Sequence, residues 1–486
     1  MEPRRARDWR SVDLVLQGGA CLLCGLVLLE LFSGWADPDE MEHAHAAWLL
    51  AQGQIPYIDF FESHLPGLWR LLRPFYTAFP TGGPGVLFWG RGIAALALFG
   101  STYCIFDIAE RLHSRRCAWL ALDIWLPFSI ASRALQIRPE MPASICALAS
   151  LWALRTRLLA PGHRPDSRWI AGSGLLCGLA MYFSPRTGFL AAGIFLTHLR
   201  ELDMRQRCTW LTLAAAGPLA AVAEVGWHDL LKWIVHFNSH QGPPFSVWHA
   251  LGLAPHGWIL LAAAVLGLWS WIDHASARTR GLALIYGLGL APVVFLEQLP
   301  YPQAFACIFP LAAILLARHL VALFEKSRAW AILGALELAV LAIWPAVQAK
   351  VLPGSFLHFE KSLFWQVQQK SYLCRRLRGE CVLMPPPYHP IGLPDASFYW
   401  VGLEYLEKMR MPDMKHHFLS DFQERRPILV FVPYIELMSR MEPDSGLREF
   451  IQRRYRPFSK DFLCRKDSAS TLDLPEPQDS AGKKLK

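Results

Sequence analysis

Charged residues are scarce in this sequence. Of its 486 residues, 18% are Asp, Glu, Lys or Arg, whereas 53% are hydrophobic. A chain with so few charges cannot bury this much apolar surface in one or two soluble cores without leaving long uncharged runs, and such runs follow one another over residues 12–348. The composition therefore excludes an ordinary soluble enzyme and indicates an integral membrane protein.

The usual nucleotide-binding and catalytic motifs are also missing. No P-loop, dinucleotide-binding glycine fingerprint, CxxC pair or nucleophile elbow occurs in a credible context. The net charge of +8 comes from Arg and Lys at the ends of apolar runs rather than from one basic face, so we expect no nucleic-acid partner. A nucleotide-linked substrate is disfavoured for the same lack of a phosphate-binding loop.

The apolar runs predict membrane-spanning helices. Lipid admits only helices or closed barrels, and a helix needs about 20 apolar residues to cross. The predicted spans, eleven in number, are 12–34, 86–110, 117–132, 140–158, 169–183, 187–199, 208–226, 254–272, 281–296, 304–323 and 329–348. The third and sixth are short, so tilting or re-entry is an alternative there. We predict an all-α polytopic membrane protein.

The distribution of basic residues predicts the orientation of these spans. Lys and Arg accumulate in short cytoplasmic loops. The amino-terminal segment and the alternate connections on its side carry 19 basic residues, whereas the opposite connections carry seven. We therefore expect a cytoplasmic amino terminus and, after an odd number of spans, an extracytoplasmic carboxy terminus.

The predicted domains are a transmembrane domain over 1–348, with a long first outer loop at 35–85, and a small α/β domain over 349–465. The expected helices of the second domain are 356–378, 397–409, 413–425 and 445–453, and its strands are 381–384 and 428–432. Residues 466–486 are polar and rich in Pro, Ser and Lys, which predicts disorder. A Cys374–Cys381 disulfide is one alternative that spacing alone does not decide.

The first outer loop concentrates residues able to do chemistry. Six carboxylates and three histidines lie within residues 36–66, beside the membrane and around an amphipathic stretch over 40–52. The alternative is a solvated acidic loop without a catalytic role. Glycosyl transfer would use the same groups, because a carboxylate must take the proton of an attacking hydroxyl and a cationic group must face a leaving phosphate.

The spacing DPDE…H.H.AW…G..PY.DFFE.H.P resembles the GT-C superfamily of polytopic glycosyltransferases. It is most similar to bacterial protein O-mannosyltransferases, aminoarabinose transferases and lipopolysaccharide galacturonosyltransferases. This resemblance implies a multi-pass protein of the plasma membrane, the inner membrane in bacteria. It also implies inverting transfer of a sugar from a polyprenyl-phosphate donor to an extracytoplasmic glycan, lipid or protein hydroxyl. The alternatives are a transporter or flippase of lipid-linked sugars, for which Glu224 and Glu337 give thin support, and an envelope scaffold.

The resemblance assigns roles within the first loop. Asp39 and Glu40 match the acidic pair that follows the first span in the family, whose Asp is the favoured base, and Asp37 competes for that role. Glu62 and His64 match a substrate-binding segment. The aminoarabinose branch has a phosphate-binding Lys there, which this chain replaces with Ser63 and His64.

Three further segments resemble cavity-lining turns of the family. Arg138 and Glu140 match an Arg-Pro-Asp turn, with a helix cap as the alternative. Arg186 matches a Ser-Pro-Lys turn and is the preferred phosphate contact, with an interfacial snorkelling Arg as the alternative. The third turn contributes Glu297, Tyr301 and Gln303.

A divalent cation is a candidate cofactor because some superfamily members use one, although none is certain. His43, His45, His236 and His240 are the histidines considered. Two positions apart on a helix, His43 and His45 point to different sides and are poorly placed to chelate one ion together. We assign no metal ligands.

Overall fold

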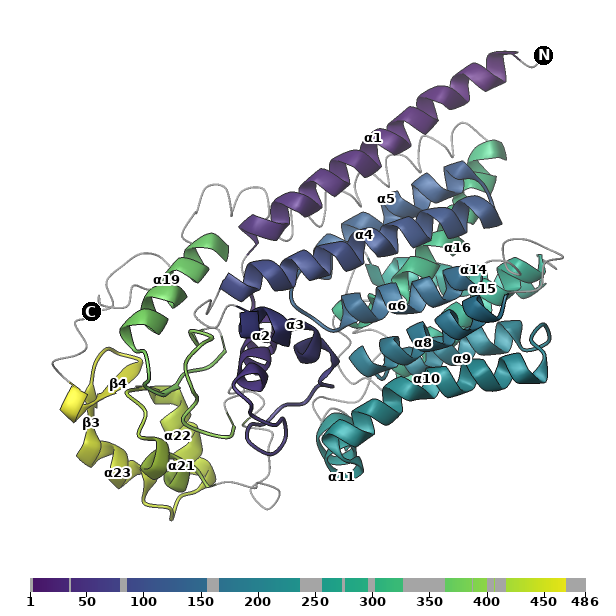
Figure 1. Cartoon of the computed structure of the whole chain (residues 1–486). Coiled ribbons are helices and arrows are strands. Elements are labelled where there is room, and N and C mark those ends of the chain that lie inside the picture. Colours follow the sequence, from purple (N-terminus) through teal and green to yellow (C-terminus); the bar gives the residue numbers. More distant parts are fainter. Residues whose placement is uncertain are drawn as a thin grey trace. The chain divides into compact units, whose positions relative to one another are not determined.

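The computed structural model describes residues 3–34, 36–78, 85–154, 166–236, 256–272, 276–295, 302–326, 363–386, 388–399, 406 and 417–468 (Figure 1). The chain forms two compact units. The first contains Met1–Gly34, His64–Leu68 and Arg91–Leu357, and the second contains Trp35–Ser63, Trp69–Gly90 and His358–Lys486. The second unit thus joins the first outer loop to the carboxy-terminal segment.

Among the residues described, every regular element of the first unit is a helix. Its helices are α1 (Pro3–Ser33), α4 (Val86–Leu112, whose first residues belong to the second unit), α5 (Arg115–Ala131), α6 (Glu140–Ala153), α8 (Ser167–Phe183), α9 (Thr187–His198), α10 (Met204–Val225), α11 (Trp227–Asp229), the π-helix η2 (Leu230–His236), α14 (His256–Ile272), α15 (Ala277–Phe295), the 3-10 helix η3 (Pro302–Phe305) and α16 (Phe309–Lys326). Ten of the eleven apolar segments predicted from the sequence are therefore helices. The eleventh, 329–348, lies outside the described residues.

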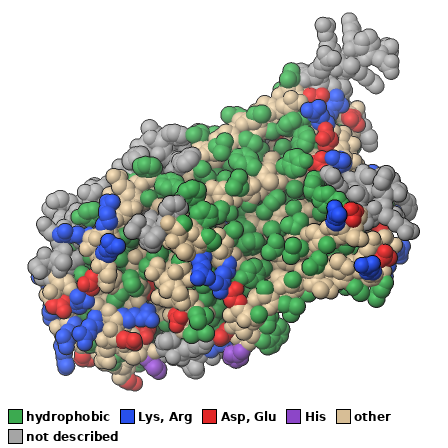
Figure 2. Space-filling model, viewed as in Figure 1, with side chains coloured by type: hydrophobic (Ala, Val, Ile, Leu, Met, Phe, Trp, Pro, Cys, Tyr) green, Lys and Arg blue, Asp and Glu red, His purple; other side chains and the backbone are tan. Residues whose placement is uncertain are grey.

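Several of these helices have the length and surface of membrane spans. Asp13–Leu31, Val86–Leu112 and Met204–Val225 are long and apolar enough to cross a bilayer, and Thr187–His198 and Ile259–Ser270 are shorter apolar helices. Leu96 is 75% exposed and Leu219 64% exposed, as expected of side chains that face lipid. Figure 2 shows hydrophobic side chains covering the visible face of these helices, with charged side chains gathered near helix ends. The number of crossings stays a prediction.

Small residues let the helices of the first unit approach closely. A Cβ placed on Gly174 of α8 would lie 2.6 Å from the carbonyl oxygen of Trp210 in α10. Trp210 Nε1 also donates to Ser173 Oγ at 3.0 Å, and Ser150 Oγ in α6 donates to the Ser173 carbonyl at 2.9 Å. Close backbone approach with hydrogen bonds between helices is the usual way that spans associate in lipid.

The second unit combines helices with a small sheet. Its elements are α2 (Pro38–Ala51), α3 (Gly67–Ala78, from Trp69 onward), α19 (Leu363–Arg376), β1 (Val382–Leu383), α21 (Phe418–Arg425), β2 (Leu429–Phe431), α22 (Val432–Met441), α23 (Leu447–Arg454), β3 (Tyr455–Pro457), β4 (Phe462–Arg465) and η6 (Lys466–Ser468). The sheet has the order β1-β2-β4-β3, with β1 parallel to β2 and the other pairs antiparallel. The predicted α/β character of the carboxy-terminal segment is confirmed. The predicted helix 397–409 lies almost entirely outside the described residues, and α22, β3 and β4 were not predicted.

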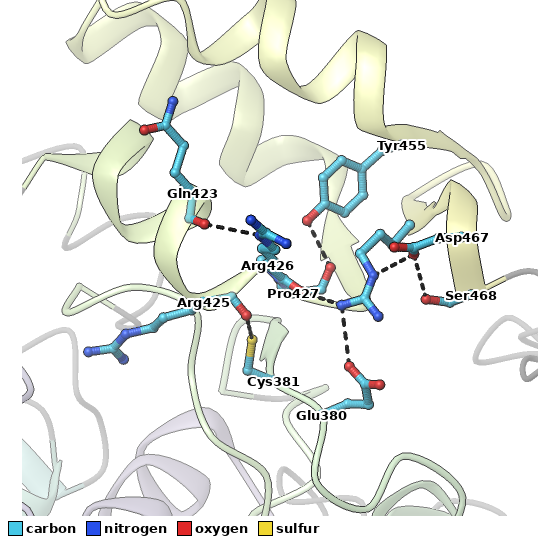
Figure 3. A network of polar contacts seen from close by, with 10 residues as sticks. Glu380, Cys381, Gln423, Arg425, Arg426, Pro427, Tyr455, Asp467 and Ser468 are labelled. Atoms are coloured by element: carbon cyan, nitrogen blue, oxygen red, sulfur yellow. Dashed lines mark hydrogen bonds and ion pairs between the residues drawn. The ribbon is translucent and has the colours of Figure 1, made fainter.

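Polar contacts tie the ends of this sheet together (Figure 3). The guanidinium of Arg465 donates from Nη1 to the Arg426 carbonyl at 2.7 Å and from Nε to Asp467 Oδ1 at 2.6 Å. Tyr455 Oη donates to the Pro427 carbonyl at 2.8 Å. Cys381 Sγ donates to the Arg425 carbonyl at 2.7 Å, and Cys374 is likewise a free thiol, so these two cysteines form no disulfide.

Candidate functional site

The candidate base lies in the first turn of α2. Asp37 is the N-cap of this helix, and its Oδ1 accepts a hydrogen bond from the backbone N–H of Glu40 at 2.9 Å. Pro38 occupies the first helical position, where its missing N–H costs nothing. Asp39 is partly exposed, whereas Glu40 is completely buried. Among the three predicted carboxylates, Asp39 is therefore the one whose side chain is partly exposed to solvent.

The carboxy-terminal segment contacts the chain just before the first turn of α2 and again near the middle of this helix. Gln366 of α19 accepts from the backbone N–H of Ala36 at 2.8 Å and donates to the Ala36 carbonyl at 3.3 Å. His45 Nε2, near the middle of α2, lies 2.5 Å from Asp395 Oδ2. Both Gln366 and Asp395 are buried. Helix α3 adds the Tyr76 hydroxyl, which donates to the Ala44 carbonyl at 2.8 Å.

The loop after α2 folds back through a tight turn. Asp59 Oδ2 accepts from the Ile55 backbone N–H at 2.7 Å, and Tyr57 adopts a positive φ of 66°. Phe61 N–H donates to the Phe398 carbonyl at 2.9 Å, so Phe61 is part of the packing with the carboxy-terminal segment. Glu62 is completely buried, and its Oε1 accepts from the Ser63 N–H at 2.9 Å. The Asp59 and Phe61 positions of the motif thus have structural roles.

A cluster of His45, His389 and Asp395 has the residue types of a metal site. Asp395 lies 2.9 Å from His389 Nε2 through Oδ1 and faces His45 through Oδ2, and all three side chains are buried. The Ile391 N–H donates to His389 Nδ1 at 3.2 Å, which means that Nδ1 carries no proton. A neutral His389 must then carry its proton on Nε2, the atom that faces Asp395. With its proton on Nε2, a neutral His389 does not fit a metal ligated through that atom.

Burial and charge act together on this cluster. Burial alone would raise the pKa of Asp395, but the two neighbouring imidazoles outweigh it and hold the pKa well below its usual value. Burial lowers the pKa of His389 to about 4, and the nearby His45 acts in the same direction. Lys370 Nζ donates to the His389 carbonyl at 2.7 Å, and burial lowers the pKa of Lys370 to about 7. These four residues form the polar centre of the second unit.

The predicted phosphate contact lies in the first unit. Arg186 Nη1 is 3.8 Å from Glu140 Oε1, and the Arg186 side chain is 40% exposed. The Cys307 thiol, which follows η3, donates to the Glu140 carbonyl at 3.5 Å. The turn before α9 is closed by Thr187 Oγ1, which donates to the Ser184 carbonyl at 2.7 Å. The structure thus brings two of the three predicted turns together beside the start of α16.

The predicted site residues are divided between the two units. Asp37, Asp39, Glu40 and Glu62 belong to the second unit, whereas His64, Arg138, Glu140, Arg186 and Gln303 belong to the first. Arg138 is buried and its Nε donates to Gln136 Oε1 at 3.3 Å. Glu297 and Tyr301 lie outside the described residues. Sequence reasoning missed Gln366, Lys370, His389 and Asp395, because a lone polar residue in a predicted soluble domain has no pattern that reveals a partner 330 or 350 residues away.

Comparisons with known proteins agree with this architecture. No family model matches the sequence. The chain is 23% identical over 269 residues to an undecaprenyl phosphate-alpha-4-amino-4-deoxy-L-arabinose arabinosyl transferase of Shewanella sediminis. That match covers 49% of this chain and 46% of the relative, so the chain matches less than half the relative's length.

Solved structures match over a longer range. The crystal structure of ArnT from Cupriavidus metallidurans bound to undecaprenyl phosphate superimposes with a TM-score of 0.56 at 14% identity, covering 97% of this chain and all of that one. The Archaeoglobus fulgidus oligosaccharyltransferase tethered to an acceptor peptide superimposes with a TM-score of 0.52 at 12% identity, covering 89% of this chain and 72% of that one.

The chain shares the fold of these two transferases. Within that fold, α1 is the first predicted span, α2 and α3 belong to the first outer loop, and the small sheet belongs to the carboxy-terminal segment. The resemblance inferred from residues 37–66 is thus supported by similarity along nearly the whole chain. Among the predicted site residues, Asp39 and Arg186 both have partly exposed side chains.

Proposed function

We propose that this chain transfers a sugar from a polyprenyl-phosphate donor to a hydroxyl of an extracytoplasmic glycan, lipid or protein acceptor. The observation that carries the proposal is the placement of Asp39, a partly exposed carboxylate in the first turn of α2, within a chain similar to an arabinosyl transferase that uses undecaprenyl phosphate. The amino terminus is cytoplasmic and the first outer loop is extracytoplasmic in this proposal.

Asp39 is the proposed general base. An acceptor hydroxyl attacks the anomeric carbon while Asp39 takes its proton, and the bond from that carbon to the phosphate oxygen breaks from the opposite side, which inverts the configuration. The leaving polyprenyl phosphate keeps the electron pair. The unpaired N–H groups of a helix's first turn, where Asp39 lies, stabilise a carboxylate.

Arg186 is the proposed partner of the donor phosphate. Its side chain is 40% exposed, and its distance of 3.8 Å from Glu140 is that of a loose ion pair which a phosphate can replace. Arginine offers a fork of donors that matches phosphate oxygens, and it would take the role that a Lys plays in the resembling turn.

The competing function is transport of lipid-linked sugars. Among the described residues, Glu224 is an acidic side chain in a predicted span that would support it. An acidic side chain inside a span is the mark of an ion or substrate pathway. Glu224 Oε2 accepts a hydrogen bond from the Tyr182 hydroxyl at 2.6 Å, linking α10 to α8. Helix packing accounts for this carboxylate, which favours the enzyme over the transporter.

The test measures lipid-linked sugars in cells. Deleting the protein should cause a polyprenyl-phosphate sugar to accumulate while an envelope glycan, lipid or glycoprotein loses that sugar. Expression of the wild-type chain or of the control Asp444→Asn should reverse both changes, because Asp444 is an exposed residue of the second unit. Asp39→Asn should be made at normal levels yet lose about 100-fold or more of the transfer rate. Normal transfer by Asp39→Asn would show that Asp39 is not the general base. If no lipid-linked sugar accumulates when the protein is deleted, the donor is not a polyprenyl-phosphate sugar.

A further inference from the structure

Helix α2 is held by residues from the far end of the chain. The contact at its start joins Gln366 to both backbone groups of Ala36, the residue just before the N-cap Asp37. The contact further along joins His45 to Asp395. The first turn, which contains Asp39 and Glu40, lies between these two attachment points.

The Gln366 contact acts directly on the cap. Its carboxamide accepts from the Ala36 N–H and donates to the Ala36 carbonyl, so the peptide groups on both sides of Ala36 are fixed. Asp37 can hold the Glu40 N–H only while its own backbone keeps the extended conformation of an N-cap, with ψ of 173°. A helix that loses its cap frays from its first turn, and that turn carries Asp39.

The Asp395 contact fixes the rotation of the helix. His45 is completely buried and reaches Asp395, which is held in turn by His389. Tyr434 of α22 lies close enough to both Asp395 and Glu42 that burial, followed by these two carboxylates, raises the pKa of its hydroxyl well above 10. A buried polar contact from the carboxy-terminal segment therefore holds the middle of α2, and rotation of the helix that carries Asp39 would break this contact.

We propose that Gln366 and Asp395 are positioning residues for the transfer reaction, which hold the α2 turn so that Asp39 meets the acceptor hydroxyl. The carboxy-terminal segment is then a working part of the transferase site. This inference rests on the proposed role of Asp39. Placement matters because a base must lie within hydrogen-bond reach of the hydroxyl, and small errors in geometry cost large factors in rate.

The first experiment measures hydrogen exchange in the full-length protein, without substrate. Gln366→Met keeps the length of the side chain but removes both hydrogen bonds to Ala36. The amides of residues 39–42 should then exchange on the order of tenfold faster, the factor expected for the loss of one to two net hydrogen bonds. Gln368→Met is the matched control, because Gln368 is an exposed residue on the same helix. Unchanged exchange in Gln366→Met would overturn the proposal.

A second pair of variants tests the other attachment point. Asp395→Asn removes the charge that faces His45 and His389. Asp421→Asn is its control, since Asp421 is also buried in the carboxy-terminal segment but accepts from Ser397 Oγ and the Phe398 N–H. Exchange along α2 should rise in Asp395→Asn and stay unchanged in Asp421→Asn. If Asp395→Asn does not accumulate, the Gln366 pair decides the question.

The transfer rate separates positioning from general destabilisation. Gln366→Met should lower transfer about tenfold at saturating donor, with the apparent KM for the donor unchanged. In the Asp39→Asn background it should cause no further loss, because there is no base left to place. A full tenfold further loss would overturn the positioning role. Normal transfer by Asp39→Asn would instead reject the proposed base, whatever the exchange data say about α2.

Discussion

Gly217 of α10 packs directly on Gly178 of α8, so closely that a Cβ added to Gly217 would lie 1.8 Å from the Gly178 carbonyl oxygen. Gly178 in turn has the Leu213 carbonyl 2.6 Å from the position of its own missing Cβ. Helices in lipid associate through van der Waals packing, which close backbone approach strengthens. These two glycines therefore determine how α8 and α10 meet.

We predict that Gly217→Ala destabilises the membrane unit by about 2 kcal/mol or more, because an added methyl group must force the two helices apart. The midpoint of thermal unfolding of the detergent-solubilised protein should fall. Gly172→Ala, also in α8, has no atom within 4 Å of the added methyl and should leave the midpoint unchanged. Equal midpoints for both variants would contradict the packing described.

The helices of the first unit could be predicted because each long apolar run has a single solution in lipid. The short elements of the second unit are different. Strand β1 was predicted from a compact apolar run, but β3 contains Arg456 and Pro457 and is defined mainly by its pairing with β4. Asp39 could be proposed from its position after a span. The Gln366 and Asp395 contacts could not, since they depend on tertiary folding between distant parts of the chain.

We predict that acidic pH destabilises the second unit. The pKa of His389 is about 4 when folded, against an ordinary value of 6.5, so the unfolded state binds more protons between these values and the free energy of unfolding falls as the pH falls through this window. Lys370 has the same effect on the free energy of unfolding at higher pH. Its pKa is about 7 when folded, against an ordinary value of 10.5, so the free energy of unfolding falls as the pH falls between these values. Protease cleavage of the carboxy-terminal segment should be faster at pH 5 than at pH 8. Replacing His389 with Gln should weaken this dependence between pH 4 and 6.5, and a cleavage rate independent of pH would count against the buried neutral His389.

Arg186 should bind the phosphate of the lipid carrier. Arg186→Ala is expected to weaken binding of undecaprenyl phosphate about 10- to 100-fold, the loss of a charge-assisted contact, and Arg186→Lys should lose less. Glu140→Gln should strengthen binding, because it removes the carboxylate 3.8 Å from the guanidinium. Arg168→Ala is the control at the opposite end of α8. Affinities that do not differ between Arg186→Ala and the control would exclude this contact.

The two attachment points of α2 also predict on which side of the membrane the first loop and the carboxy-terminal segment lie relative to each other. Hydrogen bonds such as Ala36 to Gln366 require the first loop and the carboxy-terminal segment to lie on the same side of the membrane. The chain must then cross an even number of times between residues 34 and 358. Protease added outside intact spheroplasts should cleave both segments. Cleavage of the carboxy-terminal segment only after the cytoplasm is opened would contradict this arrangement.

The separation of α2 from its partners has a consequence for synthesis of the protein. Ala36 and Gln366 are 330 residues apart, and His45 and Asp395 are 350 apart. At translation rates of roughly 5–20 residues per second, roughly 15 to 70 seconds pass between the synthesis of the first loop and the synthesis of Gln366 and Asp395, which contact it. During this interval the groups of Glu40 and His45 that are later buried face water or a chaperone. A ribosome that stops before α19 would release a chain whose helices can insert but whose first loop stays open, and such a product would be a target for envelope proteases.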